Sequence, residues 1–441
     1  MKLLSSTIGC WTLLALATSV ACADDWPRWR GPQDDGVWRE SGVRESLPEG
    51  KLTPAWSVPC GLGYAGPAVA GGKVFLFEYD KRSGEITNNA GGRDALEGIE
   101  RLRCLDATSG KELWRHEYDR PYLVSFPAGP RATPTVDGDL VYTLGAEGDL
   151  HCLRTDNGEL VWSKSTKDDY GVETPIWGHS AAPLVVGDLL VAMIGGDGTT
   201  VVAFDKKTGE QRWSALSAYE PGYCPPSLID GELVIFHPEA IVGLTPDTGE
   251  TLWSVPIKPS YGMSIASPLP VGDRLFVSGY GGVSVFLRPP AAAGGEAEVL
   301  WAGKPKTSIS CANSSPISDG EAIYGVDAND SALIAVDIAT GERLWETTEF
   351  TVGDDRRARH GTVFLVRQGE TDRYWLASET GDLSLVCLSP EGYEKLGSTR
   401  LLEPAGEAFG RPVVWSHPAF ADRAVFARND RELVRVSLAA D

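Results

Sequence analysis

A short phrase recurs five times along the 441-residue chain and constrains the fold more than any other feature. Each copy carries a polar turn, a Gly and, within four residues, a Trp. The copies are DATSGKELW (106–114), RTDNGELVW (154–162), DKKTGEQRW (205–213), TPDTGETLW (245–253) and DIATGERLW (337–345). Asp and Asn bond their own backbone in tight turns, and Gly adopts positive φ there. The phrase therefore predicts a turn that leads into a strand carrying the Trp.

The spacing of the Trp residues suits one four-stranded propeller blade per repeat. They stand at Trp114, Trp162, Trp213, Trp253, Trp301 and Trp345, between 40 and 51 residues apart. The segments between them alternate with a period of two, as in residues 133–153, and lack the 3.6-residue spacing of a helical solenoid. Each unit is predicted as strands A, B and C, the Asp/Gly turn, and a strand D whose Trp fills the gap between adjacent sheets.

The chain contains eight such units. Strand A is expected to begin near Pro67, Pro134, Pro183, Pro226, Pro268, Pro316, Thr362 and Pro418. The last unit, 416–438, ends after a third strand, whereas LTPAWSV (52–58) carries Trp56 with no strands A to C before it. We therefore predict an all-β, eight-bladed β-propeller of four-stranded blades. Its ring closes by pairing the N-terminal strand with the C-terminal blade, which leaves no open sheet edge.

Residues 1–23 have the features of a secretory signal peptide: a single Lys2, an apolar stretch and an Ala21-Cys22-Ala23 end suited to signal peptidase. We expect cleavage near Ala23, an N-terminal extension over 24–51 and the propeller over 52–441. The mature protein is expected to be a periplasmic or secreted monomer without a transmembrane segment. Two alternatives stay open: an uncleaved anchor, although the apolar stretch is short for a membrane span, and a lipid anchor on Cys22.

Charge and cysteine spacing exclude several functional classes. The formal net charge of −21 does not favour nucleic acid or an anionic lipid surface, because phosphate binding needs clustered Lys and Arg. No CxxC or Cys/His spacing indicates a zinc site, so no metal is predicted. Cys104, Cys152 and Cys387 are assigned to the strand C position that Ala203 and Ala335 fill, which predicts small buried residues rather than disulfides.

The loops that enter strand A, together with the B–C loops, are expected to gather around one mouth of the central channel. These loops hold six cations, namely Arg131, Lys258, Arg356, Arg357, Arg359 and Arg411. They hold five acids, namely Glu173, Glu220, Asp354, Asp355 and Glu407. Three histidines occur there, namely His179, His360 and His417, with Asn313 and the aromatic residues Tyr64, Trp177, Tyr223, Tyr261 and Trp415. The mouth of an acidic protein is thus neutral to slightly basic.

Guanidinium groups bind carboxylate, sulfate or phosphate in two-pronged fashion, and aromatic faces stack on rings. The mouth is therefore predicted to bind a small, anionic, ring-bearing molecule. The predicted ligand-binding residues are Arg131, Trp177, His179, Tyr223, Tyr261, Asn313, Arg356, Arg357, His360, Arg411, Trp415 and His417. For any one of them, ion pairing or packing is the competing explanation. Residues 80–101, an extra segment of the first unit, are expected to hang over the same mouth, as a lid or a decoration.

The repeated strand C, Asp/Gly turn and Trp phrase resembles the repeat of pyrroloquinoline-quinone (PQQ) enzymes, the eight-bladed quinoprotein alcohol dehydrogenases, and of the outer-membrane assembly lipoprotein BamB. The mature chain, including WPRWRGP (26–32), most closely resembles secreted PQQ-like β-propeller proteins of planctomycetes. The resemblance implies a quinoprotein dehydrogenase-like fold. It leaves three functions open: ligand binding, a PQQ-dependent alcohol or sugar dehydrogenase, and a BamB-like scaffold for protein partners.

The resemblance also implies what a dehydrogenase should contain. Such enzymes carry an adjacent pair of cysteines and hold calcium through Glu, Asn and Asp beside the quinone. This chain has no Cys-Cys pair, although Glu173, Asn313 and Asp355 fall in suitable loops. No cofactor is therefore assigned, and PQQ with Ca²⁺ belongs to the dehydrogenase alternative. If the mouth is catalytic, His179, His360 and His417 are the candidates for proton transfer.

Overall fold

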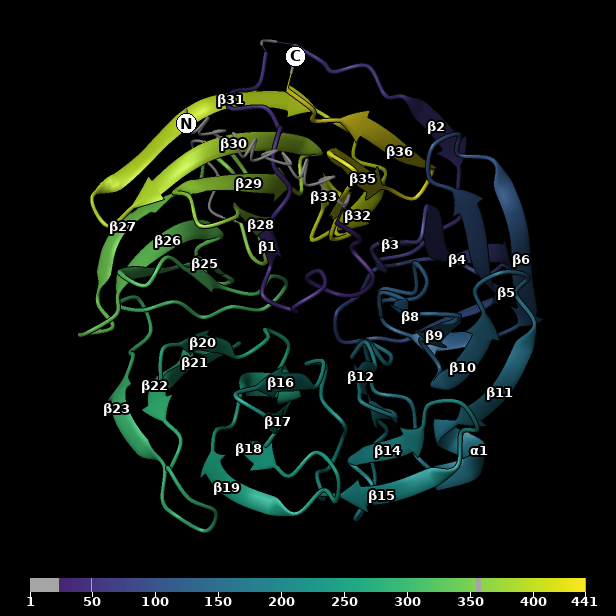
Figure 1. Ribbon diagram of the computed structural model, residues 1–441, viewed down its shortest axis with the longest axis horizontal. Helices are drawn as coiled ribbons and strands as arrows, with labels where there is room; N and C mark the ends of the chain where they lie inside the picture. The colour runs from purple at the N-terminus through teal and green to yellow at the C-terminus, as the bar shows by residue number, and fades with distance from the viewer. Residues whose placement is uncertain (1–23, 49, 354–357, 441) are drawn as a thin grey trace, which may run out of the picture.

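The computed structural model describes residues 24–48, 50–353 and 358–440, and regular structure in these ranges is almost entirely β-strand. Eight sheets stand around a central channel (Figure 1). Helix is confined to two single turns, α1 (Thr166–Tyr170) and η1 (Ser260–Gly262). None of the described helices is long and apolar enough to cross a bilayer. The prediction of an eight-bladed β-propeller is confirmed, while the predicted signal peptide lies outside the described residues.

The first four blades follow one another along the chain, and each is an antiparallel sheet in sequence order. Blade 1 comprises β3 (Ala68–Ala70), β4 (Lys73–Ser83), β5 (Asp94–Asp106) and β6 (Glu112–Asp119), with β7 (Tyr122–Val124) added to β5. Blade 2 comprises β8 (Thr135–Asp137), β9 (Leu140–Leu144), β10 (Asp149–Arg154) and β11 (Leu160–Ser165). Blade 3 comprises β12 (Leu184–Val186), β13 (Leu189–Met193), β14 (Val201–Asp205) and β15 (Gln211–Ala215). Blade 4 comprises β16 (Ser227–Ile229), β17 (Glu232–His237), β18 (Ala240–Leu244) and β19 (Thr251–Pro256).

The other four blades complete the ring. Blade 5 comprises β20 (Leu269–Val271), β21 (Arg274–Gly279), β22 (Val283–Arg288) and β23 (Glu298–Ala302). Blade 6 comprises β24 (Ile317–Ser318), β25 (Ala322–Asp327), β26 (Ala332–Asp337) and β27 (Arg343–Thr347). Blade 7 comprises β28 (Val363–Gln368), β29 (Arg373–Ser378), β30 (Asp382–Ser389) and β31 (Gly392–Arg400). Blade 8 comprises β34 (Ala419–Ala421), β35 (Ala424–Arg428), β36 (Glu432–Ser437) and the N-terminal β2 (Trp56–Pro59).

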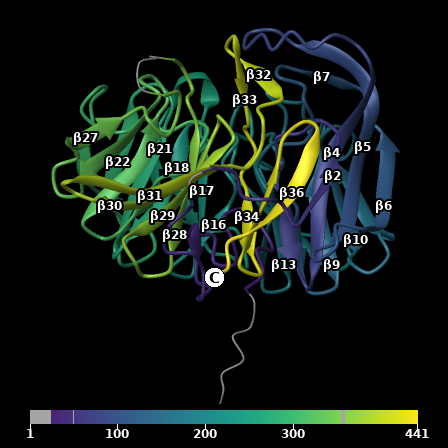
Figure 2. The same ribbon diagram turned by 90° about the horizontal axis from the view of Figure 1, so that it is seen from above.

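The ring closes through strands from the two ends of the chain. Strand β2 pairs antiparallel with β36, with Trp56 opposite Arg435 and Pro59 opposite Glu432. The predicted closure is confirmed, and every strand A begins one residue after the predicted starting point. Between blades 7 and 8, the hairpin of β32 (Gly406–Ala408) and β33 (Arg411–Val413) rises above the ring on the same face as β7 (Figure 2).

The Trp of strand D docks on the Asp/Gly turn of the next blade. The indole N–H of Trp114 donates to the carbonyl oxygen of Thr155 at 3.1 Å. Gly158 lies under the same ring with a φ of 73°, and a Cβ there would come within 2.5 Å of Trp114. The same indole hydrogen bond joins Trp56 to Ala107, Trp162 to Lys206, Trp213 to Pro246, Trp301 to Ile338 and Trp345 to Ser389. Glycine is required by the backbone and by the ring together in these turns, except in blade 7, where a Cβ at Gly392 would meet nothing within 4 Å.

Trp253 is the exception, and the sequence of the next blade explains it. The connection between β22 and β23 carries no Asp/Gly phrase. Without that turn to accept its hydrogen bond, the Trp253 indole donates to Glu232 of its own blade at 2.6 Å. A buried indole N–H needs some partner, so the loss of one turn is compensated within the blade.

The buried cysteines agree with the predicted register in two blades and disagree in one. Cys104 and Cys152 lie opposite Trp114 and Trp162 and are fully buried. Cys387 pairs with Glu394, two residues beyond the bulge that follows Leu385, and is half-buried, so its assignment was wrong. Blade 7 lacks the Trp phrase that fixes the register elsewhere. Every cysteine in the described residues is a free thiol.

An N-terminal segment, residues 24–38, crosses the central channel below the mouth. Trp26 pairs with Val69 of blade 1, and the backbone N–H of Val136 in blade 2 donates to Pro27 at 2.8 Å. On the other side, β1 (Val37–Trp38) runs parallel to β28 of blade 7. The purple trace in the centre of Figure 1 shows this crossing. The segment therefore bonds inner strands from several blades and fills the channel.

We predict that the Trp–Gly docking contributes measurably to stability. Gly249→Ala places a Cβ 2.5 Å from Trp213 at a φ of 71°. Gly72→Ala imposes the same backbone strain, at a φ of 72°, where nothing lies within 4 Å. The strain costs roughly 1 kcal/mol at both positions, so G249A is expected to lower the free energy of unfolding in urea by at least 1 kcal/mol more than G72A. Equal losses would show that the Trp ring tolerates a methyl group.

Candidate functional site

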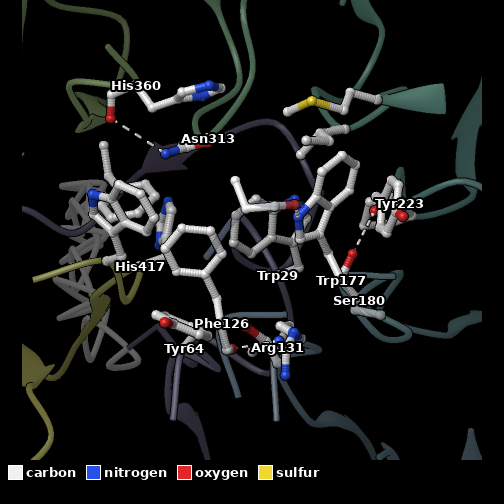
Figure 3. A pocket seen from close by; sticks show the side chains of 18 of the residues that line it. Trp29, Tyr64, Phe126, Arg131, Trp177, Ser180, Tyr223, Asn313, His360 and His417 are labelled. Atoms are coloured by element: carbon white, nitrogen blue, oxygen red, sulfur yellow. Dashed lines mark hydrogen bonds between the residues drawn. The ribbon is translucent and has the colours of Figure 1, made fainter. Parts of the chain in front are cut away.

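A cavity of about 240 Å³ lies in the central channel, where the loops entering strand A converge (Figure 3). Most of its wall is aromatic or aliphatic. The lining includes Trp29, Tyr64, Phe126, Met263, Phe364 and Phe409. Its size is just below the range of roughly 300–1,000 Å³ typical of small-molecule sites. The cavity therefore suits one or two fused rings better than an extended oligomer.

Seven of the predicted ligand-binding residues line this cavity. They are Arg131, Trp177, Tyr223, Asn313, His360, Trp415 and His417. They come from loops that enter six different blades, so only closure of the ring brings them together. The loops that carry these seven residues therefore converge at the cavity, as expected.

The remaining predicted residues lie elsewhere. His179 is buried beside the cavity with its Nε2 3.2 Å from the Thr166 hydroxyl, and Tyr261 is 75% exposed outside the lining. Arg411 bonds the buried carboxylate of Glu379 at 2.7 Å, which also accepts from the indole of Trp415 at 3.0 Å. Ion pairing thus accounts for Arg411. Arg356 and Arg357 lie outside the described residues.

Sequence reasoning missed Trp29, whose ring closes the cavity from the side of the N-terminal segment. Its indole N–H lies 3.4 Å from the Ser267 hydroxyl, and its ring centroid is 4.9 Å from that of His417. The WPRWRGP motif drew attention to this segment, but the segment precedes the ring, so the phase of the repeat could not place it.

The extra segment of blade 1 reaches the cavity as expected. Ala90, between β4 and β5, lines the cavity, and its carbonyl accepts from the Trp177 indole at 3.2 Å. Asn88 donates to the carbonyl of Glu407 in β32 at 2.7 Å, which ties the segment to the β32–β33 hairpin. The segment is therefore bonded to the mouth rather than being a free decoration.

Arg131 is held by its own loop. Its guanidinium donates to the carbonyl oxygens of Gly129, Ser125 and Phe126 at 2.5, 2.9 and 2.6 Å. It also lies 5.5 Å from the ring centroid of Tyr64. Among the described residues no carboxylate forms an ion pair with it. The cavity wall thus carries a positioned positive charge that the described part of the protein leaves without a counterion.

His417 and His360 are neutral at physiological pH. Burial lowers the pKa of His417 to about 4 and that of His360 to about 4, the latter assisted by the nearby Arg411 and Arg359 charges. The His360 ring is sandwiched between Phe409, at 4.9 Å and 8° between the planes, and Tyr280, at 5.0 Å. Both imidazoles are therefore uncharged, and His360, whose two faces are covered, can present only a ring edge to the cavity.

The residues present do not fit a calcium-bound quinone. Calcium takes six to eight oxygen ligands, several of them carboxylates. No carboxylate of the described residues lines the cavity, and Asn313 supplies the one side-chain amide there. Glu173 is exposed outside the lining, and Asp355 lies outside the described residues. The part of the chain that the structure describes also holds no cluster of three His, Cys, Asp or Glu able to bind a metal ion.

The fold and repeats define a PQQ-like β-propeller. The family model described as outer membrane protein assembly factor BamB (PQQ_2) matches residues 99–347, more than half of the chain. The chain belongs to this family.

Curated relatives share limited identity with this chain. Quinohemoprotein alcohol dehydrogenase ADH IIB of Pseudomonas putida is 28% identical over 167 residues, which are 35% of this chain and 22% of that protein. ADH-IIG of the same organism is 24% identical over 266 residues, 54% of this chain and 35% of that protein. Outer membrane protein assembly factor BamB of Burkholderia pseudomallei (strain K96243) is 25% identical over 266 residues, 50% of this chain and 66% of that protein. The matches therefore span less than two thirds of each relative.

Solved structures show the same fold over most of the chain. BamB from Moraxella catarrhalis superposes with a TM-score of 0.56 and 15% identity, covering 88% of this chain and 97% of its own. Quinohemoprotein alcohol dehydrogenase from Comamonas testosteroni superposes with a TM-score of 0.60 and 12% identity, covering 95% of this chain and 81% of its own. At such identities the likeness concerns the fold alone.

The buried His417 makes stability depend on pH. Its pKa is about 4 in the folded protein against 6.5 unfolded, so its contribution is fully present above pH 6.5 and is lost as the pH falls toward 4. Between pH 7 and pH 5 the loss should be about 2 kcal/mol. Asp34 and Asp149, with pKa values raised by burial to about 6 and about 7, oppose this slope. Our prediction therefore concerns how the change in the free energy of unfolding between pH 7 and pH 5 differs between the wild-type protein and His417→Phe.

The free energy of unfolding in urea, measured at both pH values, should fall by about 2 kcal/mol more in the wild-type protein than in His417→Phe. Because the acids are present in both proteins, their effects cancel in the comparison. Parallel pH profiles would show that His417 titrates normally in the folded state.

Proposed function

We propose that this protein is exported and binds a small, anionic, ring-bearing molecule in the cavity at the mouth of the propeller. The observation that carries the proposal is the guanidinium of Arg131, which is set among aromatic side chains without an ion-pair partner in the described residues. Arg131 is partly buried, and withdrawing a cation from water without a counterion is unfavourable. A bound anion would remove that cost.

The position of Arg131 supports direct contact with the ligand. Its hydrogen bonds to three carbonyls fix the side chain before any ligand arrives. A guanidinium held in this way loses little conformational entropy on binding. Three of its five N–H groups are donated to the carbonyls, and the remaining two, Nε–H and one Nη1–H, can each donate a single hydrogen bond to an anion. The charge of Arg131 therefore selects an anion.

The rest of the wall supports a ring. Trp177, Trp415 and Phe409 offer flat apolar faces, and such faces favour offset stacking or edge contact with an aromatic ligand. Trp29 of the N-terminal segment adds a further ring in the middle of the site, between His417 and Trp177 (Figure 3). An aromatic site of this size fits a small planar compound.

Ligand binding agrees better with the cavity than the two alternatives do. A quinone dehydrogenase would need a calcium site, and the described lining offers no carboxylate for one. A scaffold for protein partners would use exposed loops and would not require an aromatic pocket with a fixed cation. Export to the periplasm or beyond rests on the signal-like residues 1–23 and on relatives that carry the name of an outer membrane assembly factor.

The charge of Arg131 is expected to decide affinity. Naphthoate and its uncharged isostere naphthamide serve as probes in calorimetry and in quenching of tryptophan fluorescence. Naphthoate should bind at least tenfold more tightly than naphthamide, because a hydrogen bond to a charged group contributes about 1.5–3 kcal/mol. Arg131→Gln should remove this preference, and Arg131→Lys should keep part of it.

The matched control is Arg359→Gln, which removes an exposed mouth charge outside the lining and should leave the preference intact. PQQ is tested in the same way with calcium and with EDTA. If neither naphthoate nor PQQ binds at millimolar concentration, or if Arg131→Gln binds naphthoate as well as wild type, the proposed function is wrong.

A further inference from the structure

We infer that the cavity selects a ring carboxylate that carries an O–H or N–H donor at the end of the ring system away from the carboxylate. The inference rests on the proposed function and adds the pattern of hydrogen-bonding groups that the ligand must match. It follows from which polar atoms of the lining are already used and which remain free.

His417 offers an acceptor to the cavity. Its Nδ1 lies 2.6 Å from the carbonyl oxygen of Pro418. A carbonyl oxygen only accepts, so Nδ1 carries the proton, and in the neutral ring Nε2 has a free lone pair. Trp29 and Phe364 hold the ring in place, with centroids 4.9 and 5.1 Å away. A ligand atom that meets Nε2 must therefore be a hydrogen-bond donor.

Asn313 offers a second acceptor by the same reasoning. Its Nδ2 donates to the Thr362 hydroxyl at 3.1 Å and to the carbonyl oxygen of His360 at 3.4 Å. The carbonyl partner fixes which end of the amide is the NH₂ group. The amide oxygen remains, and no hydrogen bond within the described residues uses it. Acceptors thus come from the loops that enter blades 6 and 8.

Two buried hydroxyls lining the cavity have no hydrogen-bond partner. Thr133 is 3% exposed and Tyr223 is 4% exposed, and neither hydroxyl forms a hydrogen bond within the described chain. The backbone N–H of Trp177 faces the Tyr223 oxygen without full hydrogen-bond geometry. Unsatisfied buried hydroxyls are rare because each costs free energy. Two of them in one cavity point to a ligand that supplies acceptor atoms.

Thr133 and Asn313, one of the donors and one of the acceptors, stand on opposite sides of the cavity. Thr133 follows Arg131 by two residues in the loop that enters blade 2, so both can address one carboxylate. Asn313 enters blade 6, which is diametrically opposite blade 2 in a ring of eight. Figure 3 shows Arg131 and Tyr64 on one side, with Asn313 and His360 across from them. The carboxylate therefore lies toward blade 2 and the ligand's donor toward blades 6 and 8.

The test extends the naphthoate series. A hydroxynaphthoate, with its hydroxyl on the ring away from the carboxylate, is compared with naphthoate and with the corresponding methoxynaphthoate. The hydroxyl should raise affinity about five- to tenfold over naphthoate, and the methoxy compound, which cannot donate, should show no gain. His417→Phe and Asn313→Leu should each reduce the gain from the hydroxyl, measured within each variant as the ratio of its affinities for hydroxynaphthoate and naphthoate.

Thr133→Val supplies a readout that does not depend on finding the best ligand. Removing a hydroxyl without a partner should leave the melting temperature unchanged or raise it, and should weaken every carboxylate in the series about fivefold. Tyr223→Phe is the companion variant, with the same expectation for stability and weaker binding. A drop in melting temperature in both variants would show that the hydroxyls have structural partners and would overturn the inference.

The outcomes separate the two proposals. If naphthoate binds through Arg131 but the hydroxyl brings no gain, the proposed function stands and the donor pattern inferred here is wrong. If the hydroxyl gain is present but survives in both His417→Phe and Asn313→Leu, the assignment of the acceptors is wrong. If no ring carboxylate binds, both proposals fall together.

Discussion

Docking of a Trp from one blade on the glycine turn of the next is the interaction on which the rest of the structure depends. It joins an indole N–H to a backbone carbonyl and packs the ring where only glycine fits, as at Trp114 and Gly158. Because these contacts lie on the outer strands, they set the angle between blades and leave the inner loops free to vary. A chemically specific centre can then be built on a repetitive ring.

The aromatic lining at the centre of the ring and the burial of its histidines depend on a segment that is not part of the repeat. By crossing the channel, residues 24–38 bring Trp29 to the cavity and bury Trp26 against His417, with ring centroids 6.3 Å apart. Such dry surroundings keep the histidines uncharged, and Arg131 supplies the guanidinium group beside them. The result is a cavity whose electrostatics differ in sign from those of the acidic protein around it.

The repeat phrase was enough to predict the blades, their boundaries and the closing strand, because a Trp every 40 to 51 residues reports one local structure many times. The site was predictable only in part. His179 and His417 occupy the same phase of the repeat, yet α1 places Thr166 beside His179 and removes it from the cavity. Arg411 forms an ion pair with Glu379 instead of lining the cavity, and no repeat pattern reveals this tertiary contact. Contacts between non-equivalent loops have no local signature in a sequence.

Closure of the ring by strands from opposite ends of the chain has a consequence for the order of events in folding. The pairing of β2 with β36 includes a hydrogen bond between Ser57 and Glu432, 375 positions apart, and contacts so distant form slowly because of the entropy of closing the loop. The cavity takes its lining from Trp29 at one end and His417 at the other. No partly folded chain contains the site, so a bound ligand stabilises the completed ring as a whole. Binding of the ligand therefore indicates that the last strand has paired and the ring is closed.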